Sequence, residues 1–415
     1  MHKNYSGGVV LYLSDDEKRI LDGKEGTGKQ KAMELLLALG LTFDAEKLIP
    51  IKRAHVALSG QEGDTYWCEL LLEGGAKCVV PPTTNPSWDI DSLTKFYDVT
   101  REEKELGERT IDVYRRIGAK LTFCCTPGLG TNVPFLGEHV AFSESSATPY
   151  VNSAVGARTN RESSVSALAA AVIGKTPYYG YHLQENRYGD FLIDVDADLN
   201  EAYDWGILGH CVGRIAGSRN PVLRFKKQPK PGPEDFLYFG AEAATSGAVA
   251  MYHMAGITPE ALTVEMAFKG KAVPRSETVI TDKDLLDEEA LLTQATGPVN
   301  LVMLGCPHYT YDQILDVEKL FRGRKVHPDT AFWILAASDA VELADRSHLR
   351  SRLELLGVRM VADTCIDEPC WKSFENSLGI TDSPKCAYYR ERRGQAFAVR
   401  RLSDCVEAAV KGRAD

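Results

Sequence analysis

Residues 137–166 read GEHVAFSESSATPYVNSAVGARTNRESSVS, and no other part of the chain has this composition. Hydroxyl, amide, guanidinium and carboxylate side chains alternate with small residues, without an apolar period of 2 or 3.6. Such a stretch is poor material for a hydrophobic core, because each buried hydroxyl or amide needs a hydrogen-bond partner. It suits the lining of a polar pocket that holds a small anionic ligand. The alternative is a solvated loop followed by a helix that Thr159 or Asn160 caps.

Length and composition place the chain among ordinary globular proteins. Its 415 residues suffice for two or three domains, with 44% hydrophobic and 26% charged residues. The net charge of −10 argues against sequence-independent binding of nucleic acid, which needs a basic surface. No apolar run reaches the length of a membrane span, and the N-terminal segment has no apolar secretory signal. We therefore expect a cytoplasmic protein with no membrane or nucleic-acid partner.

The distribution of apolar residues predicts an α/β protein. Beyond about residue 270, short apolar runs alternate with amphipathic helical patterns, which is typical of a wound parallel sheet. The strands predicted there cover 297–306, 331–338 and 358–365. Earlier in the chain the patterns predict strands at 54–60 and 120–125, helices at 100–118 and 204–217, a small-residue helix followed by a loop at 241–262, and a polar hairpin at 175–190. The predicted domains are 1–136, with an α/β pattern, 137–270, with the polar stretch and small-residue helices, and 271–415, with the wound α/β pattern.

Small polar residues follow two of the predicted strands. Ser59-Gly60 ends the first, and Thr83-Thr84-Asn85-Pro86 follows the strand that begins near residue 77. In α/β proteins, ligands collect at the carboxyl ends of strands, so these residues are candidates for a binding site. The alternative is ordinary turn chemistry, since Ser-Gly and Asn-Pro both favour turns.

Three of the ten cysteines stand at the ends of predicted strands. They are Cys125 in Cys-Thr-Pro, Cys306 in Gly-Cys-Pro-His and Cys365 in Asp-Thr-Cys. Three thiolates that converge on one cleft would bind a soft or borderline metal, or an iron–sulfur cluster with one open position for substrate. The alternative is three core cysteines that never meet, because cysteine is often buried for its packing alone.

Several segments together resemble the aconitase X family. They are TTNP (83–86), SSATPYVNSAVGARTNRE (145–162), LGCPH (304–308), ADTC (362–365) and SPKCAYY (383–389), and the resemblance runs from about residue 9 to residue 411. It implies an aconitase-like α/β fold with several wound domains around a central cleft. Known members are iron- or iron–sulfur-dependent hydro-lyases; one branch dehydrates cis-3-hydroxy-L-proline and another 5-phosphomevalonate.

The resemblance also implies a set of site residues. Cys125, Cys306 and Cys365 would be the ligands of a [4Fe–4S] cluster, a [2Fe–2S] cluster or a single iron, with Cys124 as a core residue. The residues implied to line the substrate pocket are Ser59, Gly60, Asn85, Pro86, Asn152, Ser153, Arg161 and Lys385. Arg158 and Arg161 would bind a carboxylate or phosphate, or brace the loop that carries them. We expect Lys385, Arg158 and Ser153 to take part in catalysis.

These residues suit a dehydration. An iron with an open position can act as a Lewis acid on the leaving hydroxyl, and Arg or backbone donors can stabilise the charge that develops on a carboxylate. The sequence offers no convincing base for the proton. Aconitase-like enzymes also carry a swivelling domain, which is fused in some aconitase X proteins and a separate small subunit in others. We therefore expect a large subunit without this domain, whose small partner supplies a Ser-type base.

The substrate is the least determined property of the sequence. The loops CTPGLG (125–130) and TTNPSWD (83–89) depart from the pattern of the archaeal, phosphomevalonate branch, and SGQEGDTYW (59–67) is unlike both branches. We predict cis-3-hydroxy-L-proline, with 5-phosphomevalonate as the alternative. A non-catalytic iron–sulfur regulatory or binding protein is the alternative from another class, and the dense polar lining of 152–162 argues against it.

Overall fold

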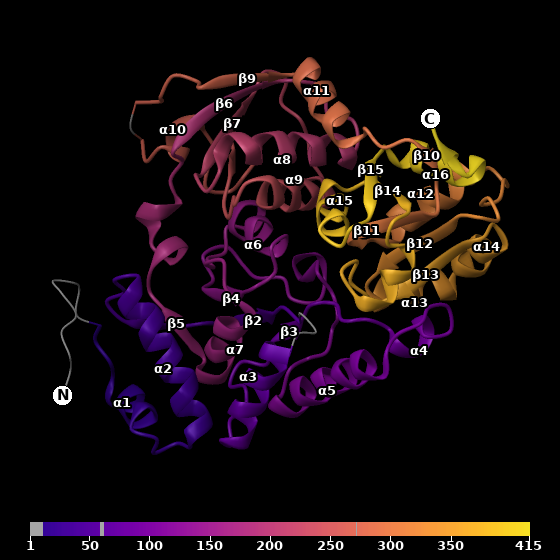
Figure 1. Cartoon of the computed structure of the whole chain (residues 1–415). Coiled ribbons are helices and arrows are strands. Elements are labelled where there is room, and N and C mark those ends of the chain that lie inside the picture. The colour runs from indigo at the N-terminus through magenta and orange to yellow at the C-terminus, as the bar shows by residue number, and fades with distance from the viewer. Residues whose placement is uncertain (1–10, 59–61, 271) are drawn as a thin grey trace.

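The structure is a computed structural model that describes residues 11–58, 62–270 and 272–415. Within these ranges, three sheets have only parallel strand pairs, as the α/β prediction requires, and helices surround them (Figure 1). The first sheet places β2 (Arg53–Val56) between β3 (Thr83–Thr84) and β4 (Val140–Phe142). The second has the order β8-β7-β6-β9, with β6 (Phe191–Asp196), β7 (Pro221–Phe225), β8 (His253–Met254) and β9 (Thr278–Thr281).

The third sheet has five strands in the order β13-β12-β11-β14-β15. They are β11 (Leu301–Tyr309), β12 (Ala331–Ala336), β13 (Val358–Ala362), β14 (Leu378–Thr381) and β15 (Ala396–Val399). Leu304 and Ile334 are fully buried in one hydrophobic cluster, whereas Met303 and Leu335 are fully buried in another. Because both faces are covered, these strands appear in the sequence as continuous apolar runs rather than alternating ones.

Local capping residues mark the ends of the helices, and the N-cap of α7 (Ser164–Ile173) is Ser163 rather than Thr159 or Asn160. Helix α5 (Arg101–Ile117) begins after a capping box of Thr100 and Glu103 and ends at Gly118, whose φ is +101°. The other helices of at least seven residues are α1 (Asp15–Leu21), α2 (Thr27–Thr42), α3 (Glu62–Glu73), α7 (Ser164–Ile173), α8 (Ala202–Ala216), α9 (Pro233–Ser246), α11 (Asp282–Leu292), α12 (Tyr311–Phe321), α13 (Ser338–Arg346), α14 (Leu349–Leu355), α15 (Pro384–Glu391) and α16 (Leu402–Lys411). Among the described residues, no helix is long and apolar enough to cross a membrane.

Two local predictions were wrong, and the bounds of a third differ. Residues 120–125 form no strand: Lys120 makes one isolated bridge to Thr83, and Phe123 has a φ of +44°, which breaks an extended run. The expected hairpin at 175–190 is instead a short strand, β5 (Lys175–Pro177), paired with β1 (Leu48–Pro50) and followed by two 3₁₀ turns. For 241–262 the sequence indicated a small-residue helix followed by a loop; the helix is present, but it begins earlier than predicted, with Pro233 at its first position, and it ends before Gly247.

Helices α8 and α9 pack so closely that their contact requires glycine. A Cβ added at Gly209 would lie 2.3 Å from the carbonyl oxygen of Phe239, whereas one added at Gly206 would have its nearest neighbours at 3.6 Å. We expect Gly209→Ala to lower the free energy of unfolding by about 1–3 kcal/mol through overpacking. We expect Gly206→Ala, the matched control in the same helix, to be neutral or to stabilise by up to about 1 kcal/mol. Urea unfolding measures both, and equal values would contradict the close contact.

Candidate active site

The three predicted cysteines lie in one buried region, although they come from distant parts of the chain. Cys306 lies within β11, Cys365 lies three residues beyond the end of β13, and Cys125 lies just before a 3₁₀ turn at Pro127–Leu129. The backbone N–H of His308 donates to Cys125 Sγ at 3.3 Å. Burial raises the pKa of the Cys306 thiol well above its ordinary value, and the nearby Cys125 and Cys365 raise it further. The thiols are therefore within electrostatic reach of one another.

The neighbouring Cys124 faces a different group. Its Sγ lies 3.2 Å from Thr126 Oγ1 and accepts from the Thr126 N–H at 3.4 Å. Burial raises the pKa of Cys124, against the hydrogen bonds from Thr126 that lower it. Cys124 thus contacts Thr126, whereas Cys125 faces the Cys306–His308 segment; the core role of Cys124 and the ligand role of Cys125 stay predictions.

A buried ion pair lies beside the thiols. Helix α15 begins at Pro384 with Ser383 as its N-cap, which places Lys385 in the first turn. Lys385 Nζ lies 2.9 Å from Glu144 Oε1, and the two side chains are 8% and 9% exposed. Burial alone would raise the pKa of Glu144, but the Lys385 ammonium, with hydrogen bonds from Asn85 and Lys385, lowers it to about 2. Burial disfavours the charged form of Lys385, yet Glu144 holds its pKa well above the ordinary value. Both groups are therefore charged at neutral pH.

The polar stretch that opened the sequence supplies the acidic member of this pair. Besides Lys385, Glu144 Oε1 accepts from Ser145 Oγ at 3.1 Å and from Ser146 Oγ at 3.0 Å and N–H at 3.2 Å. Glu144 Oε2 accepts from Asn85 Nδ2 in a short hydrogen bond. The carboxylate is thus held by donors on two loops, which offset the cost of burying its charge.

A hydrogen-bonded chain leads from Glu144 to a buried histidine. Because the ionised Glu144 can only accept, Asn85 turns its amide nitrogen to Glu144 and its Oδ1 to His55 Nε2, at 2.7 Å. His55 Nδ1 lies 2.8 Å from Thr83 Oγ1. Burial lowers the pKa of His55 to about 4, against Asn85 and Glu144 that raise it, so the imidazole is neutral. The predicted site residue Asn85 therefore connects Glu144 with the end of the first sheet.

The loop after β3 also fixes the position of Cys365. The Cys365 N–H donates to the Ser87 carbonyl at 2.9 Å, and the Ser87 N–H donates to Asp363 at 3.0 Å. His308 Nε2 lies 2.9 Å from the Thr364 carbonyl, so this nitrogen carries the hydrogen. His308 Nδ1 is buried and has no hydrogen-bond partner among the described residues. Pro86 thus precedes a loop that is joined to the predicted ligand segment.

Tyr389 adds a hydroxyl to the same region. It lies one helical turn after Lys385 on α15, so the two side chains share a face of that helix. Burial raises the pKa of the Tyr389 hydroxyl, and the charges of Lys385, Glu144, Cys306 and Cys365 also act on it. The half-buried hydroxyl makes no hydrogen bond among the described residues.

The remaining predicted residues divide into two other groups. Asn152 lies in a π-turn at Val151–Val155, where its side chain binds the Thr159 and Ala250 backbone, and Ser153 Oγ accepts from the Tyr252 N–H at 2.8 Å. Arg158 donates to the His182 carbonyl and to Gln184, and Arg161 donates to the Ala248 carbonyl. The hydrogen bonds of these four thus connect segments of the loop region, rather than reaching Lys385 or the cysteines. Ser59 and Gly60 lie outside the described residues.

Sequence reasoning missed three members of the site: Glu144, His55 and Tyr389. Glu144 lay inside the quoted stretch, and Tyr389 lay inside the SPKCAYY segment. A single carboxylate or phenol carries no spacing pattern, so neither was distinguishable from its neighbours. The position of His55 within a predicted strand, just before Ser59-Gly60, was the only available signal for that residue.

The cysteines fit iron by their chemistry. Three thiols share one buried region with the Lys385 ammonium, which lowers the pKa of Cys306 against its burial and so favours a thiolate ligand. Within the described residues, no three His, Cys, Asp or Glu side chains are already arranged to hold a metal ion. Cys125, Cys306 and Cys365 are nevertheless the donor set that this region offers to iron or an iron–sulfur cluster.

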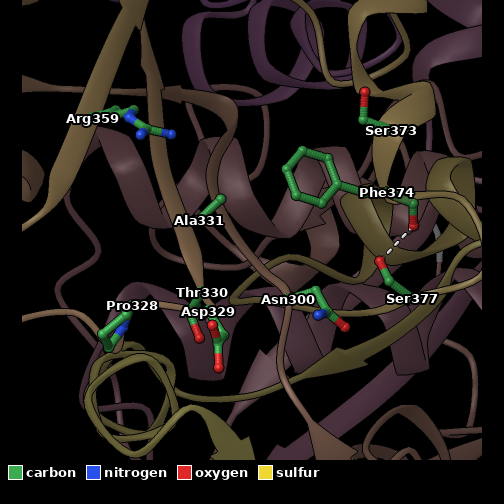
Figure 2. Close-up of a pocket in the computed structure, with 9 residues that line it drawn as sticks. All are labelled: Asn300, Pro328, Asp329, Thr330, Ala331, Arg359, Ser373, Phe374 and Ser377. Atoms are coloured by element: carbon green, nitrogen blue, oxygen red, sulfur yellow. Dashed lines mark hydrogen bonds between the residues drawn. The ribbon is translucent and has the colours of Figure 1, made fainter. Parts of the chain in front are cut away.

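Two pockets in the described part of the chain differ in their position relative to the site. One of about 330 Å³ contains Asn300, Ala331, Arg359 and Phe374 among its lining residues (Figure 2). Asn300 immediately precedes β11 and Ala331 begins β12, so this pocket lies at the amino ends of the strands, away from Cys365. A second pocket of about 140 Å³ adjoins the Cys-Thr-Pro loop and includes Cys124 and Thr126. It is smaller than the roughly 300 Å³ at which ligand pockets usually begin.

Comparison with known proteins identifies the family of the chain. The chain matches the aconitase X first domain over residues 10–185, the second domain over 189–290 and the third domain over 299–411. The crystal structure of Thermococcus kodakaraensis aconitase X in its holo-form matches with a TM-score of 0.85 and 32% identity, over 96% of this chain and 100% of that chain.

Two kinds of enzyme appear among the relatives. The phosphomevalonate dehydratase large subunit of Thermococcus kodakarensis is 35% identical over 97% of this chain and 99% of its own length. The cis-3-hydroxy-L-proline dehydratase of Hypocrea jecorina is 31% identical over 98% of this chain and 70% of its own length. The name of the first implies a second subunit in that enzyme. The chain therefore belongs to the aconitase X family and, like these relatives, is a dehydratase, that is, a hydro-lyase.

Proposed function

We propose that the chain is the large subunit of an iron-dependent hydro-lyase that removes water from a small β-hydroxy carboxylate. The buried Lys385–Glu144 pair beside three thiols carries this proposal, because it combines a fixed cation with a donor set for iron. The substrates in the names of both kinds of relative, 5-phosphomevalonate and cis-3-hydroxy-L-proline, share a hydroxyl group β to a carboxylate. We propose a cytoplasmic enzyme, since neither its charge nor its described helices suggest a membrane.

Each group of the site has a role in this reaction. Dehydration breaks the bond from carbon to the β-hydroxyl and the bond from carbon to the α-hydrogen, and it forms a carbon–carbon double bond and water. Cys125, Cys306 and Cys365 would hold the iron or iron–sulfur centre, which supplies a Lewis acid for the leaving hydroxyl. The Lys385 ammonium faces the substrate carboxylate and stabilises the negative charge that builds up there as the α-proton leaves. Asn85 and the Ser145–Ser146 hydroxyls keep Glu144 ionised, and so keep Lys385 protonated.

The α-proton is taken by a base on a small subunit that also closes the site. Two observations support a partner: the large-subunit names of relatives that match this chain end to end, and the 70% coverage of the hydroxyproline dehydratase, which leaves further sequence in that enzyme. The small size of the pocket beside the Cys-Thr-Pro loop agrees with a site that two subunits complete. Arg158, Arg161, Asn152 and Ser153 then act by holding the loop that carries Glu144, as their hydrogen bonds within the 152–252 region suggest.

The charge of the site favours cis-3-hydroxy-L-proline as substrate. Lys385 is already balanced by Glu144, so the pair has little positive charge to spare for a phosphate group. An amino acid with one carboxylate and no net charge fits this balance better than a phosphorylated acid does. The end-to-end match with phosphomevalonate dehydratase large subunits makes 5-phosphomevalonate the second candidate.

Direct assay of both compounds tests the proposal. The chain, purified without oxygen and combined with its small subunit, is expected to dehydrate cis-3-hydroxy-L-proline with a kcat/KM at least about 100-fold above that for 5-phosphomevalonate, since a poorly matched charged group costs several kcal/mol. The formation of the double bond is followed by absorbance and the product by mass spectrometry. Preferred turnover of 5-phosphomevalonate would reverse the choice of substrate. No turnover of either by an iron-loaded complex would contradict the proposed reaction.

A further inference from the structure

A second buried carboxyl group lies at the start of the helix that carries Lys385. Glu242 belongs to α9, which packs against α15 (Figure 1), and its side chain is fully buried. Glu242 Oε1 accepts from Ser383 Oγ at 2.9 Å. Its other oxygen, Oε2, has no hydrogen-bond partner among the described residues. A buried carboxyl oxygen without a partner is costly, so it calls for an explanation.

The contact to Ser383 acts on the first turn of α15. Ser383 is the N-cap of this helix, and its Oγ accepts from the Cys386 N–H at 3.1 Å. The same hydroxyl donates to Glu242, so one side chain connects the helix start with α9. Lys385 stands two residues after Ser383, and the orientation of this first turn therefore sets the direction of its side chain.

Glu242 and Glu144 differ in charge, although both carboxyl groups act on Lys385. Burial raises the pKa of Glu242 to about 8, against the Ser383 hydrogen bond and the Lys385 charge, which lower it. The other titratable groups whose charges act together with that of Glu242 are Asp382, Tyr238 and Cys386. At neutral pH a protonated Glu242 carries no charge, whereas Glu144 is fully ionised. Glu144 is therefore the anionic partner of the Lys385 ammonium.

We propose that Glu242 is a positioning residue for Lys385: its carboxyl group holds the Ser383 cap from α9 and so directs the Lys385 ammonium to Glu144 and the thiols. This inference rests on the proposed role of Lys385 in the site. It predicts that the hydrogen-bond acceptor at position 242 matters, and that its negative charge does not. Gln is therefore the conservative variant, because its amide oxygen can still accept from Ser383.

Asp382 provides a matched control on the other side of Ser383. It is also buried, its Oδ1 has no hydrogen-bond partner among the described residues, and burial raises its pKa to about 6. Its Oδ2 accepts from Tyr309 and Tyr238, so its hydrogen bonds point away from Ser383 and Lys385. If the reactivity of Lys385 responded to the replacement of any buried acid near it, Asp382→Asn would change that reactivity. If it responds only to the loss of the contact between Glu242 and Ser383, Asp382→Asn would leave it unchanged.

Chemical labelling of Lys385 tests the proposal without any turnover. The folded protein is treated briefly with acetic anhydride, and acetylation of Lys385 is measured by mass spectrometry relative to Lys227, whose side chain is 73% exposed. We expect Glu242→Ala and Ser383→Ala to raise the labelling of Lys385 about tenfold, as for the loss of a helix cap. Glu242→Gln and Asp382→Asn are expected to stay within about twofold of the unmodified chain. Unchanged labelling in both Ala variants would overturn the proposal, and Ser383→Ala decides the matter if Glu242→Ala does not fold.

Kinetics then separate positioning from mere stability. With the assembled enzyme and whichever compound it turns over, Glu242→Ala is expected to lower kcat about tenfold with little change in KM, and Glu242→Gln is expected to restore it. A stability defect alone would lower the amount of active enzyme but would not be rescued by Gln at equal folded concentration. Failure of both compounds as substrates would count against the proposed function, whereas unchanged labelling of Lys385 would count against the role of Glu242.

Discussion

Replacement of Lys385 by Met is expected to lower the free energy of unfolding by about 3–5 kcal/mol at pH 7, because it leaves Glu144 buried and unpaired. The activity of the assembled enzyme is expected to fall by at least about 1,000-fold, as for the loss of a group that stabilises charge in the transition state. Urea unfolding gives the first value, and kcat/KM for the substrate identified by direct assay gives the second. A stable variant that keeps its activity would show that the ion pair has neither role.

The double variant Lys385→Met with Glu144→Gln separates stability from activity. It removes both charges, so we expect it to regain most of the lost stability while remaining inactive. The pH dependence has a definite sign. The folded pKa of Glu144 is lowered to about 2 from an ordinary value of 4.5, so the stability it contributes is present above pH 4.5 and is lost as the pH falls towards 2. This loss is expected to be absent from the double variant.

Replacement of Cys306 by Ala is expected to remove most of the bound iron and to lower activity by at least about 100-fold, because it removes one of the three proposed ligands. Anaerobic purification followed by the visible absorption spectrum and by iron and sulfide counts measures the first effect. The same result is expected for Cys365→Ala and Cys125→Ala. The sulfide count also distinguishes a cluster from a single iron.

Cys124 is the control for this experiment. It is buried next to Cys125, yet its sulfur contacts Thr126 instead of His308. Cys124→Ala is expected to keep its iron, so a loss of iron in all four variants would indicate a general effect of changing buried cysteines. Full iron content in Cys306→Ala would contradict the proposed ligand set.

Three strands of the five-stranded sheet were predicted because they are buried on both faces, whereas β14 and β15 were not predicted. The apolar runs at 297–306, 331–338 and 358–365 are continuous, so they were recognisable without an alternation of apolar and polar residues. Strands β11, β12 and β13 lie within or largely within them. The strand predicted at 120–125 failed for a local reason, since Phe123 adopts a left-handed conformation that its apolar neighbours did not reveal. The division into domains at 136 and 270 stays a prediction.

The site could be predicted only where short motifs recur in a family. Cys125, Cys306, Cys365, Asn85 and Lys385 were proposed in this way. The structure places Asn85 and Lys385 in hydrogen-bonding contact with Glu144, and the charges of Lys385, Cys125 and Cys365 act on Cys306. Their ligand and substrate roles are proposals. Glu144 could not be found from the sequence, because its partner is 241 residues away and an ion pair over that distance leaves no local pattern. The hydrogen bonds of Arg158 could not be predicted either. Their acceptors lie in the 3₁₀ turns at 180–187, where the sequence indicated a hairpin.

The ion pair joins a loop from the first part of the chain to a helix near its C-terminal end, and this has a consequence for biosynthesis. On the ribosome, Glu144 emerges long before Lys385, and during that interval its carboxylate must stay hydrated. The polar stretch around Glu144 cannot settle into its final arrangement until α15 has been synthesised and has docked. Completion of the site therefore requires that nearly the entire polypeptide has been synthesised.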